Sequence, residues 1–176
     1  MSILFTLLTL LFPAPEDVEG LRRTAPSYLT AETARDHLVA ARVAGAIYNV
    51  DPDLMLSIAW FESRYTVNVV GPEVRGKHAC GVMQPVMETG CPKNPTLQDG
   101  YLQGAAHLRT WIDATHGDLR TAMLGYAGGY ALIKECAKGK LMVERGGRQV
   151  DLCTVVDARL YRMRWIQRTR VNTARS

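Results

Sequence analysis

The sequence predicts one mainly α-helical domain, α+β at most, and three observations lead to that fold class. Apolar residues recur at helical spacing in several segments, and most of these segments begin at a Thr or an Asp that can cap a helix. The chain has 176 residues and is 47% hydrophobic, which is enough to bury a core without a metal or a cofactor. No internal repeat or low-complexity segment divides it further.

Two helices are expected first. Residues 30–48 place Ala and Val at helical spacing after a threonine. The second helix begins after Asp51, which can cap its N-terminus, and Pro52 suits the first helical position. This second helix should run to about Tyr65.

The rest of the chain is expected to hold loops or short strands and then more helices. Gly and Pro interrupt residues 66–95, which predicts loops with at most short strands. Helical spacing resumes over residues 99–117 and should end at Gly117. Two short helices are expected next, over residues 118–126 and residues 131–137. A turn at residues 145–148 should follow, and then a final helix that opens with a capping box over Thr154–Asp157.

The final helix has an apolar side and an arginine-rich side. Leu160, Met163 and Ile166 lie on the apolar side. We interpret the arginines as a solvated face, with a docking surface for an anionic polymer as the alternative: Arg159, Arg162, Arg164, Arg168 and Arg170. The net charge of +4 and the pI near 9.0 favour anionic partners only weakly. Basic-aromatic tracts, phosphate loops and recognition-helix signatures are missing, so nucleic acid is not an expected partner.

The chain begins with an apolar run from Ile3 to Phe12. A run of this length is too short to cross a bilayer, so no stable transmembrane anchor is expected. It suits the apolar region of an export signal, although the usual basic residues before it are absent. We assign residues 1–20 to such a segment and residues 21–176 to the folded domain. The alternative is an N-terminal segment that packs on that domain.

Four cysteines form an even set without the short C-x-x-C spacing of a zinc site. We prefer two disulfides that are local in sequence, with the other two pairings and free buried thiols as alternatives: Cys80 with Cys91, and Cys136 with Cys153. Such bonds persist in a periplasm or outside a cell, which agrees with export. The histidines show no metal-ligand spacing, and no metal or cofactor is expected.

Glu62 stands in an apolar run, WFESRY, near the end of the second predicted helix. On a helical wheel it lies between Ile58 and Met55, where the helix should meet the core or the floor of a cleft. Burial disfavours the charged form of a carboxyl, so its pKa should be raised and the group should stay protonated, as a general acid requires. The alternative is a structural ion pair with an arginine such as Arg64 or Arg75.

Three motifs follow one another along the chain: ESRY at residues 62–65, CGVMQ at residues 80–84 and AMLGYAGG at residues 122–129. In this order and approximate spacing they resemble the lysozyme-like lytic transglycosylases. That family carries E-S-x-F/Y at a helix end, G-L-M-Q in the following loop and A-x-x-x-Y-N-A-G at a later helix. The similarity covers residues 51–130 and implies a single lysozyme-like domain with a peptidoglycan-binding groove.

The resemblance implies a role for each matching residue. Glu62 would be the single catalytic acid and base. Ser63 would help to hold that end of the helix, and Tyr126 would match a tyrosine whose hydroxyl lies near the catalytic carboxylate. The loop that lines the sugar subsites would include Gly81, Met83 and Gln84. The sequence departs from the family pattern at Ala127, where the family has Asn, and at Pro85, which directly follows the glutamine.

The activity that the resemblance implies is that of a murein lytic transglycosylase, a glycan lyase. Glu62 would protonate the oxygen between N-acetylmuramic acid and N-acetylglucosamine and would then act as a base, leaving 1,6-anhydromuramic acid ends. A lysozyme-type hydrolase is the first alternative, and it would need a second carboxylate such as Glu73 or Glu88. A non-catalytic glycan-binding or structural module is the second.

The expected partners are peptidoglycan glycan strands, within a larger setting such as a phage virion or a cell-envelope secretion machinery. The expected location is accordingly periplasmic or extracellular, or inside a virion.

Overall fold

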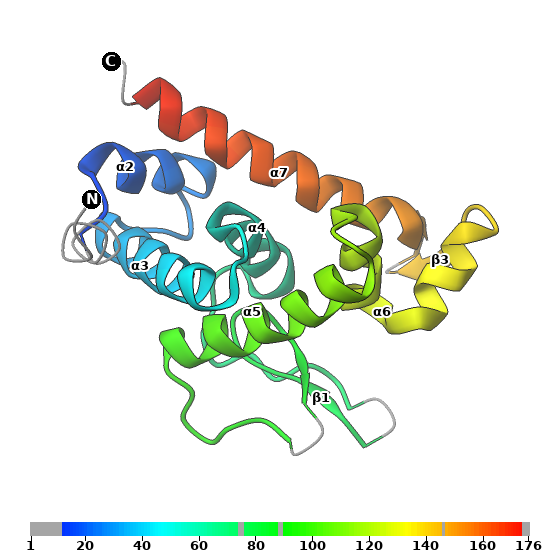
Figure 1. Cartoon of the computed structure of the whole chain (residues 1–176). Coiled ribbons are helices and arrows are strands. Elements are labelled where there is room, and N and C mark those ends of the chain that lie inside the picture. Colours follow the sequence, from blue (N-terminus) through cyan, green and yellow to red (C-terminus); the bar gives the residue numbers. More distant parts are fainter. Residues whose placement is uncertain (1–11, 74–75, 88–89, 146, 174–176) are drawn as a thin grey trace.

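A buried central helix, α4 (Pro52–Ser63), lies among the other helices of the chain (Figure 1). The computed structural model describes residues 12–73, 76–87, 90–145 and 147–173. The other helices in these ranges are α2 (Pro15–Thr24), α3 (Ala31–Tyr48), α5 (Leu97–Ala114), α6 (Leu119–Ala137) and α7 (Leu152–Thr173). Two antiparallel strand pairs accompany them: β1 (His78–Ala79) with β2 (Val86–Met87), and β3 (Met142–Arg145) with β4 (Arg148–Asp151). The prediction of a mainly α fold is confirmed.

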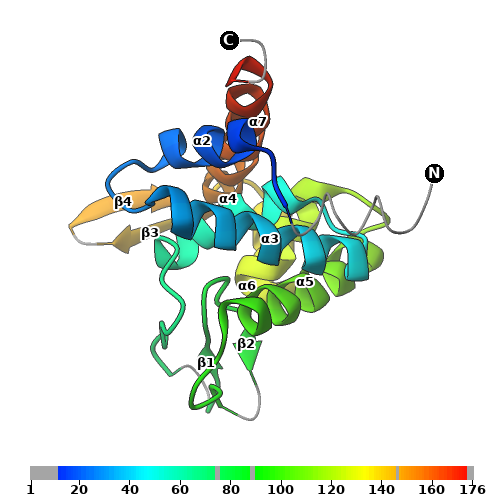
Figure 2. The same cartoon turned by 90° about the vertical axis from the view of Figure 1, so that its left-hand side faces the viewer.

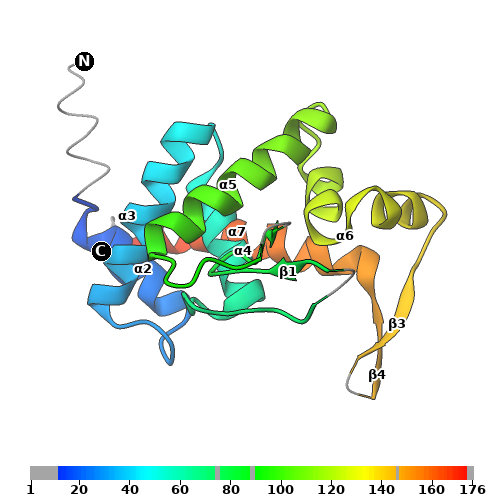
Figure 3. The same ribbon diagram turned by 90° about the horizontal axis from the view of Figure 1, so that it is seen from below.

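The helices form the body of the molecule, and the strand pairs lie at its edges. α7 runs along one side of α4, with α2 against it, while α3 and α5 lie on the other side of α4 (Figure 1). The β1–β2 pair extends below α5 (Figure 2). The β3–β4 hairpin projects from the end of the molecule where α6 and α7 meet (Figure 3).

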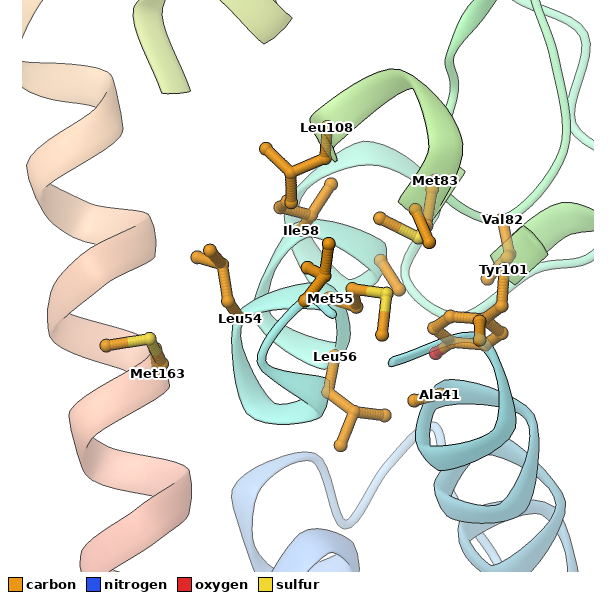
Figure 4. Packing of buried hydrophobic residues seen from close by; sticks show 14 of the residues in the cluster. Ala41, Leu54, Met55, Leu56, Ile58, Val82, Met83, Tyr101, Leu108 and Met163 are labelled. Carbon is orange, nitrogen blue, oxygen red and sulfur yellow. The ribbon is translucent and has the colours of Figure 1, made fainter. Parts of the chain in front are cut away.

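The core is centred on α4, because the middle of this helix is buried on every side. Its fully buried side chains include Leu54, Met55, Leu56 and Ile58. Met163 of α7 approaches α4 from one side and Tyr101 of α5 from the other (Figure 4). An apolar helix covered on all sides gives its terminal residues a fixed position, and Glu62 is one of those residues.

The starts of the first two predicted helices are confirmed. Thr30 caps α3, since its Oγ1 accepts a hydrogen bond of 3.1 Å from the backbone N of Thr33. Asp51 caps α4, since its Oδ1 accepts a hydrogen bond of 2.7 Å from the backbone N of Asp53. Both are the side-chain caps expected of Thr and Asp just before a helix.

Of the next two helices, α5 and α6, the first differs in extent from the prediction. α5 begins after a Thr96 cap, slightly earlier than expected, and the turn after it contains Gly117 with a φ of 86°. α6 runs from Leu119 to Ala137 and consists of two helical segments that meet at a kink. The kink is at Gly129, whose φ of 68° and ψ of −166° are not helical, so the predicted break between two short helices is confirmed. A glycine adopts this backbone conformation without the steric cost of a side chain.

α7 begins earlier than predicted. Asp151 precedes it, and its Oδ1 accepts a hydrogen bond of 3.0 Å from the backbone N of Cys153. The predicted capping box over Thr154–Asp157 is therefore wrong. Asp157 instead binds Arg120 of α6 at 2.9 Å, so it joins two helices and does not cap one.

The arginine-rich side of α7 is only partly a solvated face. Arg164 and Arg168 are exposed as predicted. The prediction is wrong for Arg159 and Arg162, which are buried, and for Arg170, which binds aspartates of α2 and α4. The physical reason is that α2 and α4 both pack against α7 and cover part of that side.

Both predicted disulfides are present. Cys80 and Cys91 join the β1–β2 region to the segment before α5, and their Cα atoms are 5.4 Å apart. Cys136 and Cys153 join the end of α6 to the start of α7, with their Cα atoms 5.5 Å apart. The free-thiol alternative is thereby excluded.

The predicted boundary after residue 20 falls inside α2, whose Val18 and Leu21 are buried in the core. Residues 1–11, which hold most of the predicted export segment, lie outside the described residues. Within the described ranges, no helix has both the length and the apolar character that crossing a membrane requires.

Candidate functional site

Glu62 lies in the last turn of α4 and contacts α7. Its side chain is 22% exposed and forms an ion pair with the guanidinium of Arg159, whose side chain is 7% exposed. A guanidinium at this position favours the charged carboxylate. The arrangement corresponds to the ion-pair alternative, but with a different partner. Arg64 turns instead to Trp60, and Arg75 lies outside the described residues.

Arg159 is fixed at its backbone as well as at its side chain. The Oγ of Ser57, a fully buried residue of α4, donates a hydrogen bond of 2.6 Å to the carbonyl oxygen of Arg159. The Nε and Nη1 atoms of Arg159 are buried and have no hydrogen-bond partner among the described residues. α4 thus contacts Arg159 twice, through Ser57 and through Glu62.

Ser63 joins the end of α4 to the predicted subsite loop, which we define as residues 81–84. Its Oγ lies 3.0 Å from the carbonyl oxygen of Ala59 and 2.7 Å from that of Val82, within hydrogen-bond distance of both. α4 ends here because Arg64 and Tyr65 have positive φ angles of 54° and 65°. The expected function of Ser63, holding this end of the helix, agrees with these contacts.

The subsite loop is a tight turn held by Gln84. The Nε2 of Gln84 donates to the carbonyl oxygens of Val69 at 2.8 Å and Gly81 at 2.7 Å. Gly81 has a φ of 71°, a conformation that favours glycine. Met83 is fully buried, and its side chain packs in the core against Gly104 of α5. In this structure the side-chain amide of Gln84 therefore bonds to the protein backbone and stabilises the turn.

Pro85, the departure that follows Gln84, does not open the loop. Its carbonyl oxygen accepts a hydrogen bond of 3.1 Å from the backbone N of Cys80. A pocket of about 110 Å³ lies beside this segment, and its lining includes Val69, Gly81 and Gln103. Glu62 does not line this pocket.

Tyr126 connects α6 to the same loop. Its hydroxyl donates a hydrogen bond of 2.7 Å to the carbonyl oxygen of Met83. Burial raises the pKa of Tyr126 well above its usual range, and the nearby charge of Glu62 raises it further, while Arg159 opposes the shift. Tyr126 therefore stays protonated and acts as a donor, and it lies close enough to Glu62 to interact with its charge.

A series of aromatic rings continues from Tyr126 to the surface. His107 of α5 packs against Tyr126 with ring centroids 5.1 Å apart. The Nε1 of Trp111 donates to the Nε2 of His107 at 3.3 Å, and the Trp111 ring lies 4.9 Å from that of Tyr130. Tyr130 is 70% exposed, whereas Tyr101 is fully buried and belongs to the core.

Of the two candidates for a second carboxylate, Glu73 and Glu88, the structure describes only Glu73. Glu73 is exposed, and its nearest recorded partner is His78, 3.8 Å away. Glu88 lies outside the described residues. Within the described part of the chain, no three His, Cys, Asp or Glu side chains are grouped so that they could hold a metal ion.

Of the three arginines of α7 that were wrongly predicted to be solvated, Arg159 is the one that contacts the candidate site. A signal was present, because Val156, Met163 and Ile166 are apolar and lie three to seven residues from Arg159, on the same helical face. All three are buried, and so is Arg159. An arginine within an apolar stripe of this kind indicates a buried partner, in the same way as the glutamate in α4.

Comparisons with known proteins give one short similarity. The chain is 45% identical over 42 residues to proteins named X polypeptide from Escherichia coli and from its strain K12. This stretch covers 24% of the chain and 25% of those proteins, so the chain matches about a quarter of the length of these relatives. No protein-family model and no solved structure matches the chain.

Proposed function

We propose that the protein is a peptidoglycan lytic transglycosylase in which Glu62 is the catalytic acid and base. One observation carries the proposal: the three motif segments, far apart in sequence, meet beside Glu62. Ser63 and Tyr126 both bond to the subsite loop, and Tyr126 interacts with the charge of Glu62. Such an arrangement fixes a carboxyl group at the end of a rigid buried helix, as acid–base catalysis requires.

In the proposed reaction, Glu62 protonates the glycosidic oxygen between N-acetylmuramic acid and N-acetylglucosamine. The acetamido group of the substrate stabilises the cation that forms at the anomeric carbon. Glu62 then removes the proton from the C6 hydroxyl of the muramic residue, and that oxygen closes the 1,6-anhydro ring. The bond is cleaved without water, so a single carboxylate is enough, and the exposed position of Glu73 is compatible with this scheme.

The same proposal includes an exported, peptidoglycan-facing location. Two disulfides tie the chain, and such bonds persist in a periplasm or outside the cell. Peptidoglycan glycan strands are the proposed partner, reached from a secretion machinery in the cell envelope or from a phage virion.

A non-catalytic glycan-binding or structural module is the second candidate, and the ion pair of Glu62 with Arg159 favours it. A buried ion pair can be structural, since removal of either partner leaves an uncompensated charge. In that case Glu62→Gln would destabilise the protein without a loss of any enzymatic activity.

The experiment compares the wild type with Glu62→Gln on purified sacculi, and Glu73→Gln is the matched control. We expect Glu62→Gln to lose at least about a hundredfold in the rate of muropeptide release, because general acid–base catalysis contributes that much. Glu73→Gln should retain the wild-type rate. Release by neither the wild type nor the control would reject the enzyme and leave the structural module.

A further inference from the structure

Arg159 is a buried cation whose compensation depends on Glu62. Its Nη2 atom binds the Glu62 carboxylate, whereas its Nε and Nη1 atoms lack hydrogen-bond partners among the described residues. Burying a charge is costly unless it is paired and hydrogen-bonded. The Glu62 carboxylate is therefore the principal interaction that offsets the burial of this guanidinium.

We propose that Arg159 is a positioning residue that holds Glu62 as a carboxylate in the free protein and lowers the pH range in which Glu62 takes up a proton. The catalytic consequence rests on the proposed function. The proton uptake itself is a property of the ion pair and does not depend on any activity.

Other groups of the described elements also lie near Glu62, and their charges differ from that of Arg159. Tyr126 faces Glu62 from α6, but burial raises its pKa so far that it stays neutral. Burial lowers the pKa of His107, which packs on Tyr126 from α5, so its neutral form is favoured. The subsite loop contributes no ionisable side chain, because it consists of Gly, Val, Met and Gln. Arg64 donates instead to the carbonyl oxygen of Trp60 at 2.7 Å.

The catalytic consequence follows from the order of the proposed steps. Glu62 must carry a proton before it can donate one to the glycosidic oxygen, and Arg159 disfavours that protonated form. The rate of muropeptide release should therefore rise as the pH falls into the range where Glu62 becomes protonated. Without the guanidinium, the same rise should begin at a higher pH.

The test is a carboxyl ¹³C NMR titration of Glu62 in the wild type, Arg159→Gln, Arg159→Lys and Arg162→Gln, with Glu62→Gln to assign the signal. Arg162 is the matched control, since it is also on α7 and, like Arg159, is 6% exposed, but it binds Thr24. We expect the midpoint to move to higher pH by about one unit or more in Arg159→Gln. It should move less in Arg159→Lys and stay unchanged in Arg162→Gln.

An unchanged midpoint in Arg159→Gln, or an equal shift in Arg162→Gln, would overturn the proposal. Circular dichroism checks that each variant is folded. If Arg159→Gln does not fold, the free energy of unfolding is measured against pH for the wild type and for Glu62→Gln. The difference between the two proteins at each pH is then compared. A carboxylate held by Arg159 stabilises the wild type at neutral pH and loses this effect as the pH falls. The opposite trend would overturn the proposal, and an absence of muropeptide release would reject only the proposed function.

Discussion

The hydroxyl of Tyr126 donates a hydrogen bond of 2.7 Å to the carbonyl oxygen of Met83, which joins α6 to the subsite loop. A second bond, from Ser63 to the carbonyl oxygen of Val82, joins α4 to the same loop. Two helices that are remote in sequence are thus fixed to a single turn beside Glu62. The geometry of the candidate site depends on these bonds, which makes them direct targets for substitution.

Tyr126→Phe removes the hydrogen bond and keeps the ring. Leaving the Met83 carbonyl without its partner should lower the free energy of unfolding by about 1–3 kcal/mol. Because the loop is then held less firmly beside Glu62, muropeptide release should also slow. Chemical denaturation measures the first effect and chromatography of released muropeptides the second. Tyr130→Phe, at an exposed tyrosine of the same helix, should change the stability little; an equal loss in both variants would contradict the role of the Met83 bond.

The Cys80–Cys91 disulfide should matter more for the rate than the Cys136–Cys153 disulfide. Both close loops of similar size, 11 and 17 residues, so the double Cys→Ser variants should each lose up to about 3 kcal/mol of stability. Cys80 directly precedes the subsite loop, however, whereas the second disulfide joins α6 to α7. Muropeptide release measured at a temperature where both variants are folded should fall mainly in the first. Equal losses would show that the disulfides act only through stability.

Tyr130→Ala should weaken binding to soluble glycan strands. Its exposed ring, which packs edge-to-face against Trp111, can pack against the face of a sugar ring, so truncation should cost about 1 kcal/mol, roughly a fivefold loss of affinity. Titration of tryptophan fluorescence with glycan strands measures the affinity. Both variants carry Glu62→Gln as well, which prevents cleavage during the measurement. Tyr161→Ala on α7, where the tyrosine is similarly exposed, is the control. The same affinity for both variants would contradict a contact of Tyr130 with the proposed glycan substrate.

Stability should fall between about pH 6.5 and pH 4 because of His37. Burial lowers the pKa of His37 from 6.5 to about 4, and its Nδ1 lies 3.0 Å from the hydroxyl of Tyr101. Below pH 6.5 the unfolded chain binds a proton that the folded protein does not bind, so stability decreases as the pH falls and levels off below about 4. The shift corresponds to roughly 3 kcal/mol.

Denaturant unfolding at several pH values measures this dependence for the wild type and for His37→Gln, which should lose most of it. His116→Asn is the control, since His116 is exposed and Asn tolerates its positive φ. A wild-type stability that does not change across this range would contradict the assignment to His37.

Local features of the sequence predicted much of the fold. The Thr and Asp caps of α3 and α4 depend on neighbouring residues only, and both were predicted correctly. The disulfides were also predictable, because each links cysteines that are close in sequence. The glutamate in an apolar helix correctly indicated contact with another element.

The partner of that glutamate could not be predicted in the same way. Arg159 follows Glu62 by 97 residues, and the packing of α7 on α4 brings them together. A helical wheel shows which side chains share a face but does not show which helix covers that face. The kink at Gly129 was predictable, by contrast, because the Gly128–Gly129 pair marks it in the local sequence.

The most direct test of the central claim is mass spectrometry of muropeptides released from sacculi by the wild type in H₂¹⁸O. The account predicts 1,6-anhydromuramic acid ends without ¹⁸O, and their loss in Glu62→Gln. Reducing ends that carry ¹⁸O would contradict it, because they would show that water, and not the C6 hydroxyl, attacks the anomeric carbon.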